Sequence, residues 1–516
     1  MPAKGVPMNE EGVAALPGKP TTLWLDTTPP TDFPPLEGDL QTDVAVLGGG
    51  IVGVLTAWFL REAGLNVILL ESRRILTGVT GHTTAKITAL HGLIYHHLTD
   101  AFGIDKARIY AEANRSAIES YATLIRDKGI DCDFRRLPAY TCAETKEELE
   151  SIRKEVGAAQ AVGLPAFFAD SVDLPFPVHG AVGLAEQALF HPRKFLLALV
   201  GELTAGGGRI FEKTRALHLR PGHPVEIETD RGCVRAGHAV QATHFPFFDP
   251  GLFFARMYPK RSYVLALRLG GAVPQGMFIT TSDPFHSLRP HPLGGEDILL
   301  FGGENHKTGH GDSTAERYRR LEAFARGYFD VRSVEYRWST HDSVTSDRVP
   351  FIGAPLFKNI HVAAGFGGWG MTQSMIAATL LRDRILGQPN PWADFYDPAR
   401  ITRTGTGRLL RENIDAATHL VKDRLVAPDR FDPAQLPAGE GGVIRRKGLE
   451  IGIARDRQGN LNAVAPACTH LGCIVSWNDG EQSWDCPCHG SRFDIDGRVI
   501  HGPAVKDLEK RTLDED

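Results

Sequence analysis

Two patterns of apolar and polar positions divide the chain into two parts. A continuous apolar run predicts a buried strand over 43–47, apolar residues at helical spacing predict a helix over 51–63, and a second apolar run predicts a strand over 66–70. From about residue 442 onward, short alternating segments such as 449–454 are typical of a small antiparallel β domain. The pattern therefore predicts an α/β part followed by an all-β part.

The same pattern predicts the boundaries of these parts. Residues 1–40 are rich in proline and are predicted to form an extended lead-in, and the α/β part follows over 41–395. A linker is expected over 396–437, in which apolar residues at helical spacing predict an amphipathic helix that prolines then end. The all-β domain is predicted over 438–516.

The turn between the first strand and the first helix has the glycine pattern of a dinucleotide-binding βαβ unit. Gly48 permits the tight turn, Gly50 lets the backbone approach a pyrophosphate, and Gly53 lets the helix pack on the strand. The helix start can bind the pyrophosphate, and Glu71, which stands 23 positions after Gly48 at the end of the second strand, can bind ribose hydroxyls. A glycine-rich turn without a ligand is the alternative, but strand, helix and acid are all in place.

A second glycine-rich turn lies far downstream, between an apolar strand over 360–364 and a predicted helix over 371–386. Backbone amides at such a helix start can hydrogen-bond the pyrimidine edge of a flavin. The turn alone would also suit a plain strand-to-helix connection. The cofactor contacts predicted here are Gly365, Gly367, Gly368, Gly370 and Met371.

Together, the two glycine-rich turns resemble the family of D-amino-acid oxidase, glycine oxidase and the sarcosine or dimethylglycine dehydrogenases. Weaker matches at 190–192, 239–242 and 347–353 extend the resemblance over roughly 40–390. It implies FAD in a Rossmann-like α/β flavin domain, interleaved with an α+β substrate subdomain. No second GxGxxG with an acid is found, so a separate NAD site is not expected.

Two short boxes in the last fifth of the chain each combine cysteines with a histidine. Two cysteines on one iron and two histidines on the other form the ligand set of a Rieske 2Fe–2S centre. A zinc site or a plain disulfide pair is the alternative, but both usually involve Cys-x-x-Cys spacing, which neither box has. Short strands predicted over 474–477 and 482–485 would bring the boxes together. The boxes are Cys468-Thr469-His470-Leu471-Gly472-Cys473 and Cys486-Pro487-Cys488-His489-Gly490-Ser491.

These boxes resemble those of the Rieske proteins of respiratory and photosynthetic complexes. The whole chain resembles a bacterial arrangement in which an amine-oxidase-like flavoprotein is fused to a C-terminal Rieske domain. The resemblance implies that Cys468, His470, Cys486 and His489 hold the cluster, while Cys473 and Cys488 form a disulfide.

Charge and composition narrow the possible partners and location. A formal net charge of −5 and a pI near 6.5 argue against a nucleic-acid partner, since such proteins carry a basic excess. No run of 18 apolar residues occurs, so no transmembrane segment is expected, and the N-terminus lacks the apolar core of a signal peptide. Three further cysteines without a pattern suggest a reducing compartment. A cytoplasmic location is therefore expected.

Two histidines are candidates for catalysis. His82 lies where FAD-lining loops of the resembled family run, and Thr80 and His82 are predicted cofactor contacts. In dimethylglycine-type dehydrogenases a histidine after a Ser-Thr-Trp stretch bonds covalently to FAD. Here Gly81 replaces the tryptophan, so covalent and non-covalent binding of FAD both remain alternatives. His91 is followed by His96 and His97, and one of these is expected to line the flavin while the others lie on a helix surface.

Asp342 is the third catalytic candidate and bears on the substrate's charge. Amino-acid oxidases of the resembled family place a carboxylate-binding arginine at the matching position. A carboxylate there would attract a cation, which favours an amine or quaternary ammonium substrate over a free amino acid. A plain ion pair of Asp342 with Arg337 or Arg348 is the alternative.

The two redox groups together predict a dehydrogenase. A flavin takes two electrons from a small amine-like substrate, whereas the cluster passes electrons one at a time to an external acceptor, either a protein or a quinone. An oxidase reoxidised by oxygen would not need a cluster. The alternatives are an electron-transfer module serving a partner oxygenase and a cluster-based redox sensor.

Overall fold

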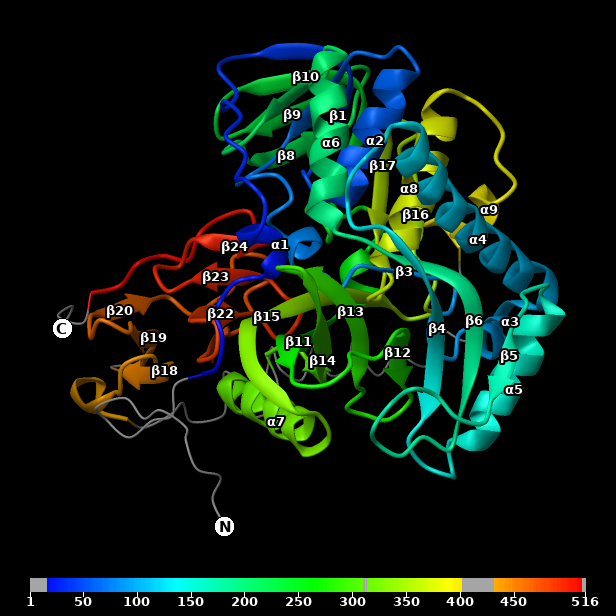
Figure 1. Cartoon of the computed structure of the whole chain (residues 1–516). Coiled ribbons are helices and arrows are strands. Elements are labelled where there is room, and N and C mark those ends of the chain that lie inside the picture. The colour runs from blue at the N-terminus through cyan, green and yellow to red at the C-terminus, as the bar shows by residue number, and fades with distance from the viewer. Residues whose placement is uncertain (1–15, 310, 312, 401–430, 447, 513–516) are drawn as a thin grey trace.

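The computed structural model describes residues 16–309, 311, 313–400, 431–446 and 448–512, and Figure 1 shows their arrangement. Two sheets with their helices form the α/β part, and the C-terminal β domain lies beside β15 and α7 of that part. The apolar residues that predict the linker helix all fall within 401–430, which lies outside the described residues.

The first sheet is the predicted dinucleotide-binding sheet and has eight strands. They are β1 (Leu40–Leu47), β2 (Val67–Leu70), β7 (Arg209–Phe211), β8 (Ala216–Arg220), β9 (Val225–Thr229), β10 (Cys233–Gln241), β16 (Phe351–Gly353) and β17 (Ile360–Ala364). The order β16-β17-β10-β1-β2-β7 is parallel from β17 to β7. Its helices are α2 (Ile51–Glu62), α6 (Pro192–Ala205) and α8 (Gly370–Ile385). The predicted βαβ unit is confirmed, because β1 pairs directly with β2 and α2 connects them.

The second sheet carries the interleaved substrate part and has nine strands in the order β15-β11-β14-β13-β12-β4-β6-β3, with β5 on β6. Their bounds are β3 (Lys86–Ile87), β4 (Arg135–Ala143), β5 (Phe167–Ala169), β6 (Gly180–Leu189), β11 (Met257–Leu269), β12 (Met277–Thr280), β13 (Ser287–Leu293), β14 (Glu296–Lys307) and β15 (Val331–Thr345). The helices of this part are α3 (Tyr95–Phe102), α4 (Ile104–Asp127), α5 (Leu149–Ala161), α7 (Thr314–Tyr328) and, near the end of the α/β part, α9 (Ala393–Tyr396).

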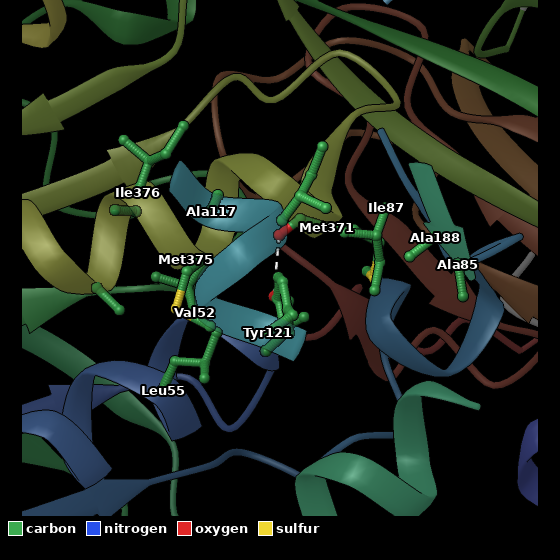
Figure 2. Close-up of a cluster of buried hydrophobic side chains, with 14 of the residues drawn as sticks. Val52, Leu55, Ala85, Ile87, Ala117, Tyr121, Ala188, Met371, Met375 and Ile376 are labelled. Atoms are coloured by element: carbon green, nitrogen blue, oxygen red, sulfur yellow. Dashed lines mark hydrogen bonds between the residues drawn. The ribbon is translucent and has the colours of Figure 1, made fainter. Parts of the chain in front are cut away.

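The core between α2, α4 and α8 fixes the two helices that follow the glycine-rich turns (Figure 2). Val52 of α2 and Met375 of α8 are buried there, and burying such a side chain contributes about 1.5–3 kcal/mol. The Tyr121 hydroxyl of α4 donates a hydrogen bond to the Met371 carbonyl at 2.9 Å. The starts of α2 and α8 are thereby held in fixed positions.

The C-terminal domain is all-β, as predicted. Its first sheet consists of β18 (Gly441–Arg446), β19 (Leu449–Arg455) and β20 (Leu461–Val464), and its second of β21 (Ser476–Asn478), β22 (Ser483–Asp485), β23 (Arg492–Asp494) and β24 (Val499–His501). All pairings are antiparallel. The hairpin expected between the two boxes is present as β21 and β22, with shorter strands than predicted.

Part of the lead-in is packed rather than only extended. One helical turn, α1 (Leu23–Asp26), begins at Thr22, whose hydroxyl accepts from the Leu25 N–H at 3.2 Å. Trp24 is fully buried and donates to the Thr83 carbonyl at 2.7 Å, so this segment supports the loop before β3. Within the described ranges, no helix has both the length and the apolar character that a membrane crossing requires.

Candidate functional site

A cavity of about 620 Å³ lies where both sheets and the C-terminal domain meet. Its lining includes 48–52 from the first glycine-rich turn and 363–371 from the second. Strands β11 and β15 supply further residues, and 499–505 of the C-terminal domain complete the lining. Turns that lie more than 300 residues apart in the sequence, at 48–52 and 363–371, thus open into one space.

The glycines of the first turn serve different purposes. A Cβ on Gly48, whose φ is +106°, would lie 2.5 Å from the Ala242 carbonyl oxygen. A Cβ on Gly53 would lie 1.9 Å from the Gly48 oxygen, so both positions require glycine for packing. Gly50 has only the Thr80 hydroxyl near its side-chain position, at 3.2 Å, so here the backbone is open to a ligand.

Glu71 and Thr80 line the cavity beside the start of α2. The Glu71 carboxylate accepts from the Gly49 N–H at 2.8 Å and from the Arg73 N–H at 2.9 Å. The Thr80 hydroxyl accepts from the Ile51 N–H at 2.9 Å. A carboxylate can accept about four hydrogen bonds, so Glu71 keeps capacity for ribose hydroxyls.

The second turn presents open backbone to the same cavity. Gly365 is crowded, because a Cβ there would lie 2.3 Å from the Thr345 methyl group. By contrast, the nearest atoms to a Cβ on Gly367, Gly368 or Gly370 lie at 3.8 Å. The cavity, the uncrowded glycines and the two helix starts fit a flavin dinucleotide.

The predicted catalytic histidines occupy different places: His91 is buried, whereas His82 is half-buried. His91 lines the cavity and stacks on Trp369 with ring centroids 4.6 Å apart. Its Nε2 contacts the Thr88 carbonyl at 2.7 Å and its Nδ1 the Tyr110 hydroxyl at 2.6 Å, and burial lowers its pKa to about 3. His82 contacts the Gly78 carbonyl at 2.8 Å and is not part of the described cavity lining.

Asp342 lines the cavity opposite Lys260, its register partner on β11. Burial raises the pKa of Asp342 to about 6, against the opposing effects of the Gly368 N–H hydrogen bond and the Lys260 charge. Arg337, one of the proposed partners, instead donates to the Pro17 carbonyl at 3.0 Å. The site therefore places a carboxylate and an ammonium group side by side.

Lys86 is a cavity residue that the sequence did not reveal. Its ammonium donates to the Phe278 carbonyl at 2.6 Å and contacts the Ser287 hydroxyl at 2.7 Å. Burial, followed by the charge of Arg289, lowers its pKa to about 7. The side chain is half-buried and lines the cavity. No motif indicates this position, because it depends on the pairing of β3 with β6.

The two boxes converge in the C-terminal domain. The rings of His470 and His489 lie 5.0 Å apart, and burial lowers their pKa values to about 4 and about 3. Their Nδ1 atoms are buried without a hydrogen-bond partner. The thiols of Cys468 and Cys486 hydrogen-bond to each other, which lowers the pKa of Cys468 to about 7. Two neutral imidazoles with free nitrogens beside two thiols fit the Rieske ligand set.

Cys473 and Cys488 form a disulfide between the boxes. The sulfur atoms of Cys473, Cys486 and Cys488 all lie within 4.8 Å of one another. Because two of these sulfurs are bonded to each other, the group does not offer three thiolates. Cys468 and Cys486 thus remain the two cysteines of the boxes outside the disulfide.

A buried charge network joins the C-terminal domain to the second sheet. Arg261 of β11 forms ion pairs with Glu481 at 3.2 Å and with Asp485 at 2.8 Å. The nitrogen that faces Asp485 is close enough for an ion pair but does not have the geometry of a hydrogen bond. Arg492 pairs with the same two acids at 2.6 and 3.1 Å. Burial opposes ionisation of Glu481, but the charges of Arg492 and Arg261 lower its pKa overall. The network therefore holds four ionised groups at the contact between domains.

Aromatic side chains of the α/β part pack against His470 and His489, the two histidines of the boxes. Phe245 lines the cavity, is 2% exposed, and has its ring 6.5 Å from that of His470 and 6.3 Å from that of His489. Phe254 meets His489 with ring centroids 5.7 Å apart. One phenyl ring thus lies between the cavity and the histidine side of the boxes.

Three further histidines lie at the same boundary. His244 and His501 line the cavity, and their ring centroids are 5.0 Å apart. His341 lies 5.5 Å from His244 and 5.0 Å from His501. A Cβ on Gly490, which follows His489, would lie 2.3 Å from the His341 ring. These contacts extend from the cavity to the second box.

Fold and site together define a flavin-dependent oxidoreductase joined to an iron–sulfur domain. Residues 43–384 match the family described as FAD dependent oxidoreductase, and residues 430–512 match the Rieske [2Fe-2S] domain. The chain belongs to the FAD dependent oxidoreductase family and carries a Rieske domain at its C-terminal side. The prediction of an FAD enzyme with a 2Fe–2S cluster is thereby confirmed.

Relatives match one or both parts. The chain is 39% identical over 502 residues to the Rieske 2Fe-2S iron-sulfur protein YhfW of Bacillus subtilis (strain 168), a match that covers 96% of this chain and 98% of that protein. It is 24% identical over 410 residues to the Gamma-glutamylputrescine oxidoreductase of Escherichia coli (strain K12), a match that covers 76% of this chain and 95% of that protein. The crystal structure of glycine oxidase from Geobacillus kaustophilus superposes with a TM-score of 0.59 at 18% sequence identity. The superposition covers 70% of this chain and 99% of the glycine oxidase chain.

Proposed function

We propose that the protein is a dehydrogenase that oxidises a small amine-like substrate and passes the electrons singly through the Rieske cluster to an external acceptor. The position of Phe245 supports this proposal, because Phe245 lines the cavity and its ring lies 6.5 Å from that of His470 and 6.3 Å from that of His489. The domain contact supports transfer within one chain, because a cavity-lining residue lies directly against the two histidines of the cluster site. FAD supplies two-electron oxidation when bound, and the cluster supplies one-electron transfer.

In this proposal, Cys468, His470, Cys486 and His489 hold the cluster, as the unpaired Nδ1 atoms and paired thiols support. The protein's own residues position the FAD through the two glycine-rich turns and through Glu71. His91 keeps Trp369 against the cavity by stacking and stays neutral because burial lowers its pKa.

Asp342 is proposed to bind the substrate's ammonium group. A charge-assisted hydrogen bond of this kind contributes about 1.5–3 kcal/mol. Lys260 beside it supports a variant of this proposal, in which the substrate also carries a carboxylate that Lys260 binds. The E. coli relative is named for gamma-glutamylputrescine, and that compound contains both kinds of group.

An anaerobic screen tests the proposal. Matched amines with and without a carboxylate are mixed with the enzyme while flavin and cluster absorbance are followed together. Bleaching of both by one compound supports the dehydrogenase, and comparison of Asp342→Asn with Lys260→Met separates the two substrate variants. If no amine reduces the flavin, the electron-transfer module serving a partner oxygenase becomes the better account. Cluster reduction that changes the oligomeric state would favour the redox sensor.

Phe245→Leu tests the route between the two groups. It should slow cluster reduction without slowing flavin reduction. Phe247→Leu is the matched control, because Phe247 also lines the cavity and lies two residues away. Equal cluster reduction rates in both variants would contradict the proposed route.

A further inference from the structure

One wall of the FAD cavity comes from the Rieske domain. Residues 499–505, which begin with β24, line the cavity together with Glu71, Arg73 and Arg215 of the α/β part. Burial is the largest cause that lowers the pKa of His501, and the charge of Arg73 makes a smaller contribution in the same direction, which places the two groups within electrostatic range. The lining thus combines side chains of two domains that family models describe as separate units.

Arg215 fastens this segment beside the end of the cavity that holds Glu71. The preceding residue, Thr214, donates its N–H to the Glu71 carbonyl at 2.9 Å. The Arg215 guanidinium donates to the Val505 and Val499 carbonyls at 3.3 Å each. It also pairs with Asp507 at 3.3 Å. The Rieske segment is therefore tied to the position where the ribose hydroxyls are expected.

The segment is also tied to the cluster site at its other side. The Ala504 N–H donates to the Ser491 hydroxyl at 3.1 Å, and Ser491 follows His489 by two positions in the second box. The Val499 N–H donates to Asp507 at 2.8 Å, so the same carboxylate holds both the segment and Arg215. One short segment thus joins the cavity wall to the cluster loop.

We propose that residues 499–505 form part of the FAD site, so that FAD binding and docking of the Rieske domain stabilise each other. A ligand that binds better when the domains are docked shifts the equilibrium toward docking, and docking raises the affinity for the ligand by the same factor. The proposal rests on FAD occupying the cavity and does not depend on the direction of electron flow or on the substrate.

A docking contact away from the cavity allows a clean test. Asp479 of the Rieske domain accepts from the Thr314 N–H at 2.9 Å and from the Ala315 N–H at 3.2 Å, at the start of α7. None of these three residues belongs to the cavity lining. Loss of such a cap costs about 0.5–2 kcal/mol. Asp479→Ala should therefore release FAD about two- to thirtyfold faster, measured as the fluorescence of freed flavin.

The matched control is Asp456→Ala. Asp456 accepts from the Gln458 N–H at 2.9 Å and from the Asn460 N–H at 2.7 Å within its own turn. This variant removes a similar set of hydrogen bonds from the Rieske domain without touching the domain contact. It should release FAD at the wild-type rate.

Hydrogen–deuterium exchange gives a second, activity-independent readout. In wild type, residues 499–507 should exchange more slowly with FAD bound than in the apoprotein, and Asp479→Ala should reduce that difference. Equal exchange of 499–507 with and without FAD would overturn the proposal. An unchanged FAD release rate in a variant whose first α7 turn exchanges faster would also overturn it.

Discussion

Removing the Glu481 charge should separate the Rieske domain from the second sheet. Glu481 accepts from Arg492 at 2.6 Å within its own domain. Across the domain contact it accepts from Arg261 at 3.2 Å, from the Ser339 N–H at 3.0 Å and from the Tyr318 hydroxyl at 3.2 Å. Glu481→Gln keeps the shape of the side chain but leaves the buried Arg261 with one acid in place of two.

The expected cost follows from burial. Removing one partner of a buried ion pair costs about 3–5 kcal/mol. Because 19% of the Glu481 side chain remains exposed, we take the lower end, about 3 kcal/mol. This corresponds to a roughly 100-fold shift toward the undocked state. The control is Glu450→Gln, whose side chain is also 19% exposed but whose partner, Arg445, belongs to the same domain.

The assay is hydrogen–deuterium exchange of β15 and the first turn of α7, with cluster absorbance as a check that the Rieske domain stays folded. The Glu481 variant should exchange faster at both sites, and the Glu450 variant should not.

The contribution of Glu481 to docking should decrease on acidification. Since the pKa of Glu481 is lowered in the folded protein, its contribution is full above the ordinary glutamate range, near 4.3, and is lost on acidification below it. If β15 and the first turn of α7 exchange at neutral pH as slowly in Glu481→Gln as in wild type, the network has no role in docking.

Three further substitutions test the site itself. Asp342→Asn should weaken binding of a cationic amine about 10- to 100-fold above pH 6, where the wild-type carboxylate is charged, and unchanged KM values would contradict the ammonium contact. Because the pKa of Lys86 is lowered to about 7, the rate of flavin reduction should change with pH near 7, and Lys86→Met should abolish this change. A pH dependence near 7 that persists in the variant would exclude Lys86 as its cause. His489→Cys should lower the cluster potential in a redox titration followed by electron paramagnetic resonance, because a thiolate adds negative charge to the cluster, and an unaltered potential would argue against ligation by His489.

The sequence predicted those parts of the site that short segments define. The glycines of the first turn and Glu71 lie within a single βαβ unit, so spacing and hydrophobic pattern were enough to predict them. The cysteine–histidine boxes are equally local, and the predicted hairpin between them is present as β21 and β22. The resemblance to known families supplied FAD and the cluster. It also supplied the pairing of Cys473 with Cys488, and this disulfide is present in the structure.

The parts that could not be predicted depend on contacts between distant residues. Lys260 and Asp342 become neighbours only through the register of β11 with β15. Arg261 and Glu481 are separated by 220 positions, and the sequence does not reveal how two folded domains meet. The wall formed by 499–505 was missed for the same reason, because it belongs to a different domain from the glycine-rich turns.

Electrons from an amine-like substrate are proposed to reach the cluster within one chain. The most direct measurement is anaerobic rapid mixing of the enzyme with a reducing substrate, with flavin absorbance and the electron paramagnetic resonance signal of the cluster recorded at several protein concentrations. The cluster should become reduced after the flavin, with a rate constant that does not change with protein concentration. A flavin that is fully reduced while the cluster stays oxidised, or a rate constant that rises with protein concentration, would contradict it.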